Sequence, residues 1–179
     1  AKEMNSTISF VVGEMEELPF EDKSFDFITG FNSFQYAANV KNALTEAKRV
    51  LKDNGKLVAM IWGNKEDCEA VGSLLPPPPP GAAGPFALSE NKLLETMLEE
   101  VGFTIVDNID LVSVWDYPDH ATAMKGLMAS GPVARAIDNS GIDKVTETIS
   151  SAILPYEQPN GHVVYRNKFR IVTTENIVR

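Results

Sequence analysis

The sequence predicts a mixed α/β fold in which buried strands alternate with amphipathic helices. Residues 57–62 (LVAMIW) are apolar without alternation, as in a strand that is covered on both faces. Residues 40–51 carry apolar side chains at helical spacing. Strand, helix and strand joined by short links form a right-handed crossover unit. With 179 residues, 44% of them hydrophobic, we expect a single domain over residues 1–179 with one sizeable core.

Two strands are expected at the start of the chain. Residues 8–12 (ISFVV) form a short β-branched and aromatic run that stops at Gly13. Residues 25–31 (FDFITGF) form a second such run after the turn-rich segment LPFEDKS. Both patterns predict buried strands.

The crossover helix is expected to begin at Asn39, whose side chain can cap it. Its apolar stripe consists of Val40, Ala43, Leu44, Ala47, Val50 and Leu51. Lys48, Arg49 and Lys52 fall in the last turn, where cations complement the helix dipole. Asn54-Gly55 is expected to supply the left-handed turn that ends this helix before strand 57–62.

A proline run and a second helix follow. Pro76–Pro80 can form neither a helix nor a central strand, so we expect an extended polyproline segment, either as a stiff loop over a pocket or as a ligand for a proline-recognition domain. Ser89 is expected to cap a helix that ends at Gly102. The stripe of this helix is Leu93, Leu94, Met97, Leu98 and Val101, which leaves Glu95, Glu99 and Glu100 facing water.

The last two strands, residues 104–115 and 163–174, are expected to pair antiparallel, and the second alternates well. Between them, residues 118–155 predict two or three short helices, broken at Gly131-Pro132 and at Ser140-Gly141. This segment is too long for a hairpin turn. We interpret it as a helical insertion that serves as a lid.

Charge and composition narrow the function classes. A net charge of −9 argues against nucleic acid as a partner, because phosphate binding needs clustered cations. The densest basic cluster is Arg166, Lys168 and Arg170 on one face of a strand, either a solvated edge or a patch for an anion or partner. Cys68 is the only cysteine and no apolar run is long enough to span a membrane, so a cytoplasmic location is expected. The start at Ala1 without an initiator Met suggests a cut N-terminus.

Two motifs point to a family. Residues 13–20 (GEMEELPF) followed by Ser24-Phe25-Asp26 resemble the acidic-then-LPF segment before the fourth strand of class I methyltransferases. Residues 43–51 (ALTEAKRVL) followed by Gly55 resemble the helix and glycine turn before their fifth strand. The resemblance is closest to S-adenosylmethionine-dependent enzymes of the ubiquinone and menaquinone biosynthesis type. It implies the C-terminal part of a truncated Rossmann-like methyltransferase sheet, mixed because of the antiparallel C-terminal pair, with S-adenosylmethionine as cofactor and a small-molecule methyl acceptor.

The resemblance also implies a cofactor site. Glu14 takes the place of a carboxylate that accepts from the adenine amino group, and the Met15 amide would face an adenine ring nitrogen. Gly30, Phe31 and Asn32 would border the sulfonium side, since ligands in open α/β sheets bind beyond the carboxyl ends of the strands. The alternative is that residues 14–17 form only a charged, solvated loop.

Methyl transfer from a sulfonium requires alignment and exclusion of water more than it requires a nucleophilic triad or a metal. Gln35, Tyr36 and Trp62 follow strand ends and are candidates for the substrate pocket, although aromatic residues there are often core. A general base is optional. His120, at the start of the lid, is the candidate, with Tyr36, Tyr117, Asp119 and His162 as alternatives.

The glycine-rich cofactor loop of the family does not precede residue 8 in these 179 residues. We therefore expect the chain alone to bind the cofactor weakly or not at all. In the family the two absent strands lie between segments 8–12 and 25–31, which would leave an open sheet edge. Either the first strand shifts onto the second or two copies form a homodimer through that edge. The competing interpretations are a non-catalytic dimerisation or interaction module that uses this edge, and half of a nicotinamide-dependent dehydrogenase.

Overall fold

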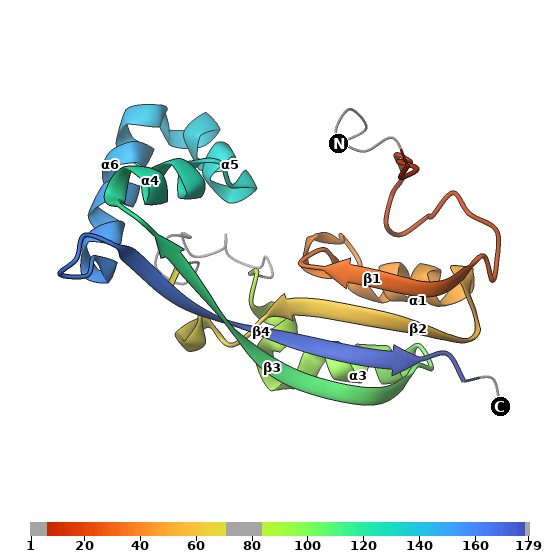
Figure 1. Cartoon of the computed structure of the whole chain (residues 1–179). Helices are drawn as coiled ribbons and strands as arrows, with labels where there is room; N and C mark the ends of the chain where they lie inside the picture. The colour runs from red at the N-terminus through yellow and green to blue at the C-terminus, as the bar shows by residue number, and fades with distance from the viewer. Residues whose placement is uncertain (1–6, 71–83, 178–179) are drawn as a thin grey trace. The chain divides into compact units, whose positions relative to one another are not determined.

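The computed structural model describes residues 7–70 and 84–177, and the chain divides into two compact units (Figure 1). Unit 1 comprises residues 1–61, 91–109 and 171–179, and unit 2 comprises residues 62–90 and 110–170. Each unit is described by itself. The single domain over residues 1–179 stays a prediction. The Pro76–Pro80 run lies outside the described residues.

The strands form a mixed sheet in the order β1-β2-β4-β3. They are β1 (Phe25–Phe31), β2 (Leu51–Trp62), β3 (Thr104–Tyr117) and β4 (Val163–Glu175). Strands β1 and β2 are parallel, as the crossover unit predicts. The arrows in Figure 1 show β4 running against both β2 and β3. The predicted α/β fold with an antiparallel C-terminal pair is confirmed.

Backbone hydrogen bonds confirm the direction of β4 beside β2. In unit 1 the Asn176 N–H donates to Gly55 O at 2.9 Å, and in unit 2 the Gly63 N–H donates to Lys168 O at 2.7 Å. Residue numbers thus fall along one strand as they rise along the other, which defines an antiparallel pair.

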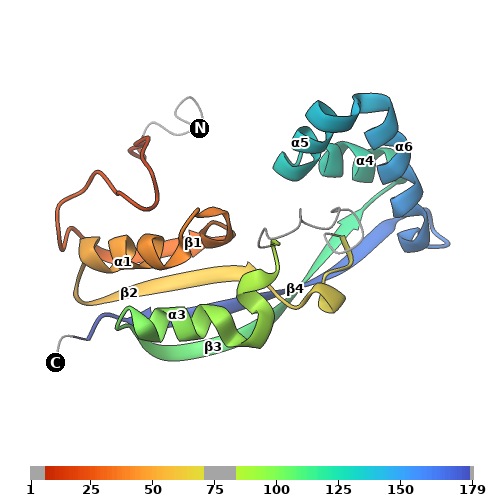
Figure 2. The ribbon, with the colours of Figure 1, turned by 180° about the vertical axis from the view of Figure 1, so that it is seen from behind.

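The helices of unit 1 are α1 (Val40–Val50) and α3 (Leu93–Glu100), with a short 3-10 turn, η1 (Phe34–Tyr36), before α1. Asn39 caps α1 as predicted, because its side chain accepts a hydrogen bond from the Asn42 N–H. The stripe of α1 is buried through Ala43, Leu44, Ala47 and Val50. Figure 2, which turns the view of Figure 1 by half a rotation, shows α1 beside β1 and β2, and α3 beside β3 and β4.

The insertion in unit 2 consists of three helices, α4 (His120–Met128), α5 (Gly131–Ser140) and α6 (Ile142–Ile153), broken where the glycines predict. Three short 3-10 turns lie elsewhere in the described residues. They are η2 (Lys65–Asp67) after β2, η3 (Ala87–Lys92) before α3, and η4 (Leu154–Tyr156) after α6. The helices share one core with β4, formed by Ala123, Leu127, Val133, Val145, Ile149, Ile153, Val163 and Tyr165. The role of the insertion as a lid stays a prediction.

The strand predicted at residues 8–12 is wrong. These residues have no regular secondary structure, and Val11 and Val12 are 58% and 100% exposed. A strand needs a neighbour for its backbone hydrogen bonds, and the sheet order of the described residues places none of β1 to β4 beside this segment. The proposed shift of the first strand onto the second is not observed.

Three local predictions are also wrong. Helix α1 ends at Val50, and Asn54, at a left-handed φ of 61°, lies within β2 instead of ending the helix. Ser89 caps no helix, since it lies within η3 and its hydroxyl donates to Trp62 O. Glu95 is only 6% exposed and accepts a hydrogen bond from the Asn108 side chain, so it does not face water.

The helices found in residues 7–70 and 84–177 are all too short or too polar to cross a membrane.

Candidate functional site

The loop that carries Glu14 and Met15 is compact. We call residues 13–20 the acidic loop. The Glu17 N–H donates to Glu14 O at 3.1 Å, which closes a tight turn. The backbone of Gly13 lies against Pro19, because a Cβ placed on Gly13 would be 2.8 Å from Pro19 Cδ. Glu14 is exposed and Met15 is half-buried. The carboxylate of Glu14 is therefore presented to solvent at the tip of an ordered turn.

Hydrogen bonds at both ends of helix α1 hold this loop. At its start, the Asn39 N–H donates to Glu16 Oε1 at 2.8 Å. Toward its end, Glu46 Oε2 accepts from the Leu18 N–H at 2.9 Å, and Arg49 Nη2 donates to Leu18 O at 3.0 Å. The position of the acidic loop thus depends on the folding of α1 and not on its own sequence alone.

Glu46 and Arg49 form an ion pair on one face of α1. Arg49 Nε donates to Glu46 Oε1 and Arg49 Nη2 donates to Glu46 Oε2, both at 2.8 Å. This hydrogen bonding lowers the pKa of Glu46 and raises the pKa of Arg49. Both groups stay charged around neutral pH, so the attachment of the loop is a charge-assisted one.

The carboxyl end of β1 combines a tight backbone with polar and aromatic side chains. Gly30 is buried, whereas Phe31 is 56% exposed. Asn32 has a left-handed φ of 47°, and its N–H donates to Met60 O at 2.8 Å. Gln35 Oε1 is buried and accepts no hydrogen bond from any residue that the structure describes. Tyr36 is 63% exposed.

The structure brings these two groups of predicted residues to one element. The bond from the Asn39 N–H to Glu16 attaches the acidic loop to the start of α1, and η1, with Gln35 and Tyr36, directly precedes this start. The loop and the end of β1 therefore border the same helix N-terminus. An exposed carboxylate, backbone amides and aromatic rings suit a nucleoside, which offers N–H donors and a flat π-face.

Trp62 lies in unit 2, where it is part of an aromatic cluster. Its ring is 4.6 Å from the ring of Phe169 and 6.0 Å from that of Trp115, centroid to centroid. It is only 9% exposed. Packing explains this side chain without a ligand, and its place in a substrate pocket stays a prediction.

His120, the candidate general base, has partners on both ring nitrogens. Nδ1 lies 2.6 Å from Glu157 Oε1, and Nε2 lies 3.1 Å from Ser150 Oγ. The ring thus links the start of α4 to α6 and to the segment after η4. Among the alternatives, Asp119 caps α4, and His162 pairs with Asp116 at 2.7 Å. Each of these three groups has a structural task, and the role of His120 as a general base stays a prediction.

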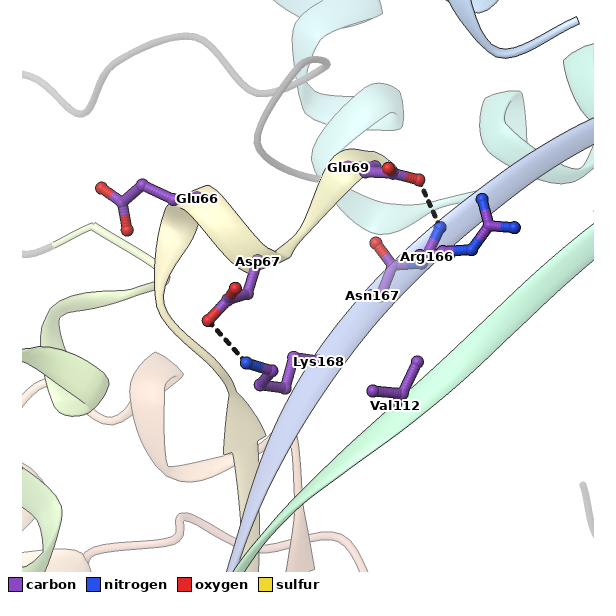
Figure 3. Close-up of a pocket in the computed structure, with 7 residues that line it drawn as sticks. All are labelled: Glu66, Asp67, Glu69, Val112, Arg166, Asn167 and Lys168. Atoms are coloured by element: carbon purple, nitrogen blue, oxygen red, sulfur yellow. Dashed lines mark hydrogen bonds and ion pairs between the residues drawn. The ribbon is translucent and has the colours of Figure 1, made fainter.

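A charged pocket of about 240 Å³ lies within unit 2 (Figure 3). Lys168 Nζ pairs with Asp67 at 3.0 Å inside it, and the Arg166 N–H donates to the carboxylate of Glu69. The other lining residues are Glu66, Val112 and Asn167. Beyond the pocket, Arg170 pairs with Asp110 at 3.2 Å. The predicted edge position of the basic cluster is wrong, because β4 lies between β2 and β3. Carboxylates pair with Lys168 and Arg170 of this cluster.

Sequence reasoning missed the contribution of Arg49, which it assigned to the helix dipole. The available signal was the spacing Glu46-x-x-Arg49, which puts an acid and a base on one helix face. The contact with Leu18 was not visible, because it joins residues that are 31 positions apart.

Comparison with known proteins places residues 1–59 in a match to a family model described as a methyltransferase domain. The chain is 45% identical over 60 residues to a ubiquinone/menaquinone biosynthesis C-methyltransferase of Rickettsia prowazekii, an alignment that covers 34% of this chain and 24% of the relative. It is 22% identical over 151 residues to a mitochondrial 2-methoxy-6-polyprenyl-1,4-benzoquinol methylase of Bos taurus, covering 82% of this chain and 38% of the relative. The chain thus spans less than half the length of these relatives.

Solved structures share the fold. A putative methyltransferase from Bacillus halodurans matches with a TM-score of 0.57 at 14% identity, over 97% of this chain and 79% of that one. The [4+2]-cyclase SpnF matches with a TM-score of 0.56 at 19% identity, over 99% of this chain and 59% of that one. Because a cyclase shares this fold, the fold by itself does not identify the reaction.

Proposed function

The chain is related to the class I S-adenosylmethionine-dependent methyltransferases, and from this relationship we propose that it forms the C-terminal part of an enzyme that methylates a small molecule. The observation that carries the proposal is the bond between Asn39 and Glu16, which attaches the acidic loop to the helix that follows the end of β1. This contact places the acidic loop at the same helix N-terminus that follows the end of β1.

The residues present fit one side of the cofactor. Glu14 would accept from the adenine amino group through its exposed carboxylate, and the Met15 amide would face an adenine ring nitrogen. Gly30, Phe31 and Asn32 would border the sulfonium, with Gln35 Oε1 as a buried acceptor nearby in the chain. Bound S-adenosylmethionine would supply an already activated methyl group. The task of this chain is then to orient the acceptor and to exclude water.

The acceptor is proposed as a small molecule, with Gln35 and Tyr36 of unit 1 as candidates for its pocket. Relatives named as benzoquinol methylases make a quinol ring the first acceptor to assay. Phe31 and Tyr36 expose aromatic rings that can stack on such a ring. His120 is the candidate general base within the proposed lid, and this role requires it to exchange Ser150 or Glu157 for the substrate. A cytoplasmic location is proposed from the single cysteine.

We further propose that these 179 residues bind the cofactor weakly on their own. The glycine loop and the ribose-binding acid of the family are not among them. Two or three charge-assisted hydrogen bonds are therefore lacking, worth roughly 3 to 9 kcal/mol together. Isothermal titration with S-adenosylhomocysteine should show a dissociation constant well above micromolar. A micromolar constant would contradict this part of the proposal.

The test of the site is a titration with S-adenosylhomocysteine followed by amide chemical shifts, which report even weak binding. We expect concentration-dependent shifts at Met15 and at residues 30–32. Glu14→Gln should weaken the shift at Met15, because an amide oxygen is a weaker acceptor for the adenine amino group than a carboxylate. Glu17→Gln is the matched control, since Glu17 is an exposed carboxylate of the same turn. Shifts confined to other residues would sink the proposed site.

A second candidate function is a dimerisation or interaction module. Strand β1 ends the sheet order of the described residues and leaves Phe27 and Phe31 55% and 56% exposed. Such an edge favours pairing with another strand, and here the proposed partner is a second copy of the chain. Sedimentation should show a dimer that Phe27→Lys dissociates. A monomer at high concentration would rule out this candidate and leave the methyltransferase proposal intact.

A further inference from the structure

Arg49 directs both terminal nitrogens of its guanidinium toward the segment before β1. Nη2 donates to Leu18 O at 3.0 Å, and Nη1 donates to Phe20 O at 2.8 Å. Nη1 also donates to Asp22 Oδ1 at 2.7 Å. Together with the two bonds to Glu46, the side chain therefore connects α1 to the acidic loop and to Asp22, two residues beyond the loop.

This arrangement needs arginine. A planar fork with five N–H donors can bind a carboxylate through two bonds and still reach backbone carbonyls, whereas a lysine ammonium is a single point donor. The side chains of Arg49 and Glu46 are 31% and 18% exposed, so the pair is partly shielded from solvent. Lys41, on the same helix, pairs instead with Glu100 of α3, and both of these side chains are more than half exposed.

The pair holds Leu18 at both of its backbone groups. Glu46 Oε2 accepts from the Leu18 N–H, and Arg49 donates to the Leu18 carbonyl. Glu17, the residue before Leu18, in turn donates its N–H to Glu14 O. The position of the turn that carries Glu14 and Met15 is therefore set from its C-terminal end by Arg49 and Glu46.

We propose that Arg49 is a positioning residue for the adenine side of the cofactor site, acting through the acidic loop. The inference rests on the proposed function, because the importance of the loop comes from Glu14 and Met15. It goes further because it assigns a role to a helix residue that would not touch the cofactor itself. Arg49 would control where Glu14 and Met15 lie.

The first experiment measures amide hydrogen exchange in the full chain. Arg49→Met keeps the apolar stem and removes the guanidinium. It should speed exchange at the Leu18 amide by about tenfold or more, since a charge-assisted bond network is lost. Arg49→Lys should restore protection only in part. Lys41→Met is the matched control on the same helix and should leave the Leu18 amide unchanged. Equal protection in Arg49→Met and the unsubstituted chain would overturn the inference.

The second experiment separates positioning from a merely structural role. In a titration with S-adenosylhomocysteine, Arg49→Met should lose the shift at Met15 and retain the shifts at residues 30–32. Loss of all these shifts together would indicate general disruption and count against positioning. If the unsubstituted chain shows no response at any of them, the proposed function fails and the cofactor role of Arg49 with it. A normal response that Arg49→Met leaves intact overturns this inference alone.

Discussion

Gly30 and Phe34 approach so closely that no side chain fits at position 30. A Cβ placed on Gly30 would lie 2.2 Å from Phe34 Cε2, and Phe34 is itself buried. The ring packs directly on the backbone near the end of strand β1, at the point where the proposed sulfonium-side residues begin. The glycine is thus required by packing, and its φ is not in the left-handed range.

Gly30→Ala should therefore destabilise the protein. The added methyl forces the Phe34 ring to move, and overpacking of this kind costs roughly 1 to 3 kcal/mol. Urea unfolding will measure the change in the free energy of unfolding. Gly131→Ala is the control, because nothing lies within 4 Å of a Cβ at that position. Equal stability of the two variants would mean that the contact with Phe34 relaxes at no cost.

The cap of α4 should make stability depend on pH. Asp119 Oδ1 accepts from the Thr122 N–H at 2.7 Å, and this backbone hydrogen bond lowers the pKa of Asp119. A folded-state pKa below the unfolded value gives stability that is present above the unfolded pKa and is lost as the pH falls through the folded pKa. Asp119→Asn keeps a capping side chain that does not titrate.

We therefore expect the unsubstituted chain to lose more stability than Asp119→Asn between about pH 7 and about pH 3. Urea midpoints at both pH values provide the measurement. Asp138→Asn removes an exposed carboxylate inside α5 that caps no helix, so its pH dependence should follow that of the unsubstituted chain. A parallel loss of stability in Asp119→Asn would show that the cap does not contribute to the pH dependence.

Asn176 connects the segment after β4 to the junction between α1 and β2. Its Nδ2 donates to Leu51 O and Lys52 O, both at 3.2 Å, and its Oδ1 accepts from Lys48 Nζ at 2.8 Å. The residue is 5% exposed. Asn176→Ala should cost roughly 1 to 3 kcal/mol of unfolding free energy, because buried groups lose their partners. Asn139→Ala, at an exposed position of α5, should change it little, and similar losses in both variants would contradict this account.

Two cations of β4 should differ in their contribution to stability. Arg170 is 14% exposed and bonds to Asp110 and to Ser89 O, so Arg170→Met should cost roughly 1 to 3 kcal/mol. Lys168 and Asp67 are 31% and 37% exposed, and Lys168→Met should cost less than about 1 kcal/mol. Thermal unfolding of the two variants provides the comparison. A larger effect at Lys168 would show that the pocket of Figure 3 shields its ion pair from solvent.

The elements that sequence predicts well depend on local signals. Asn39 caps α1 and the predicted stripe is buried, because helical spacing and a cap lie within a few adjacent residues. Strand β1 has the predicted bounds, since the turn-rich LPFEDKS segment marks its start. Residues 8–12 have the same apolar character as β1, but a strand also needs a partner, which is a non-local condition.

The side chains whose environment was predicted wrongly have partners far away in the sequence. Ser89 donates to Trp62 O across 27 positions, which no capping rule contains. Glu95 meets Asn108 in the first half of β3, so a residue that helical periodicity places on the outside becomes buried. The site behaves in the same way. A motif identifies the acidic loop, whereas only the fold shows that Arg49 holds it.

The helical insertion begins and ends at neighbouring points of the strand pair formed by β3 and β4. Asp116, near the end of β3, pairs with His162, just before β4, at 2.7 Å, and Glu157 reaches His120 at 2.6 Å. The two ends of the three-helix insertion are thus linked to each other by these side-chain pairs. A segment with this geometry can differ in length and sequence from one protein to the next, or be replaced by design, while the register of the two strands is kept.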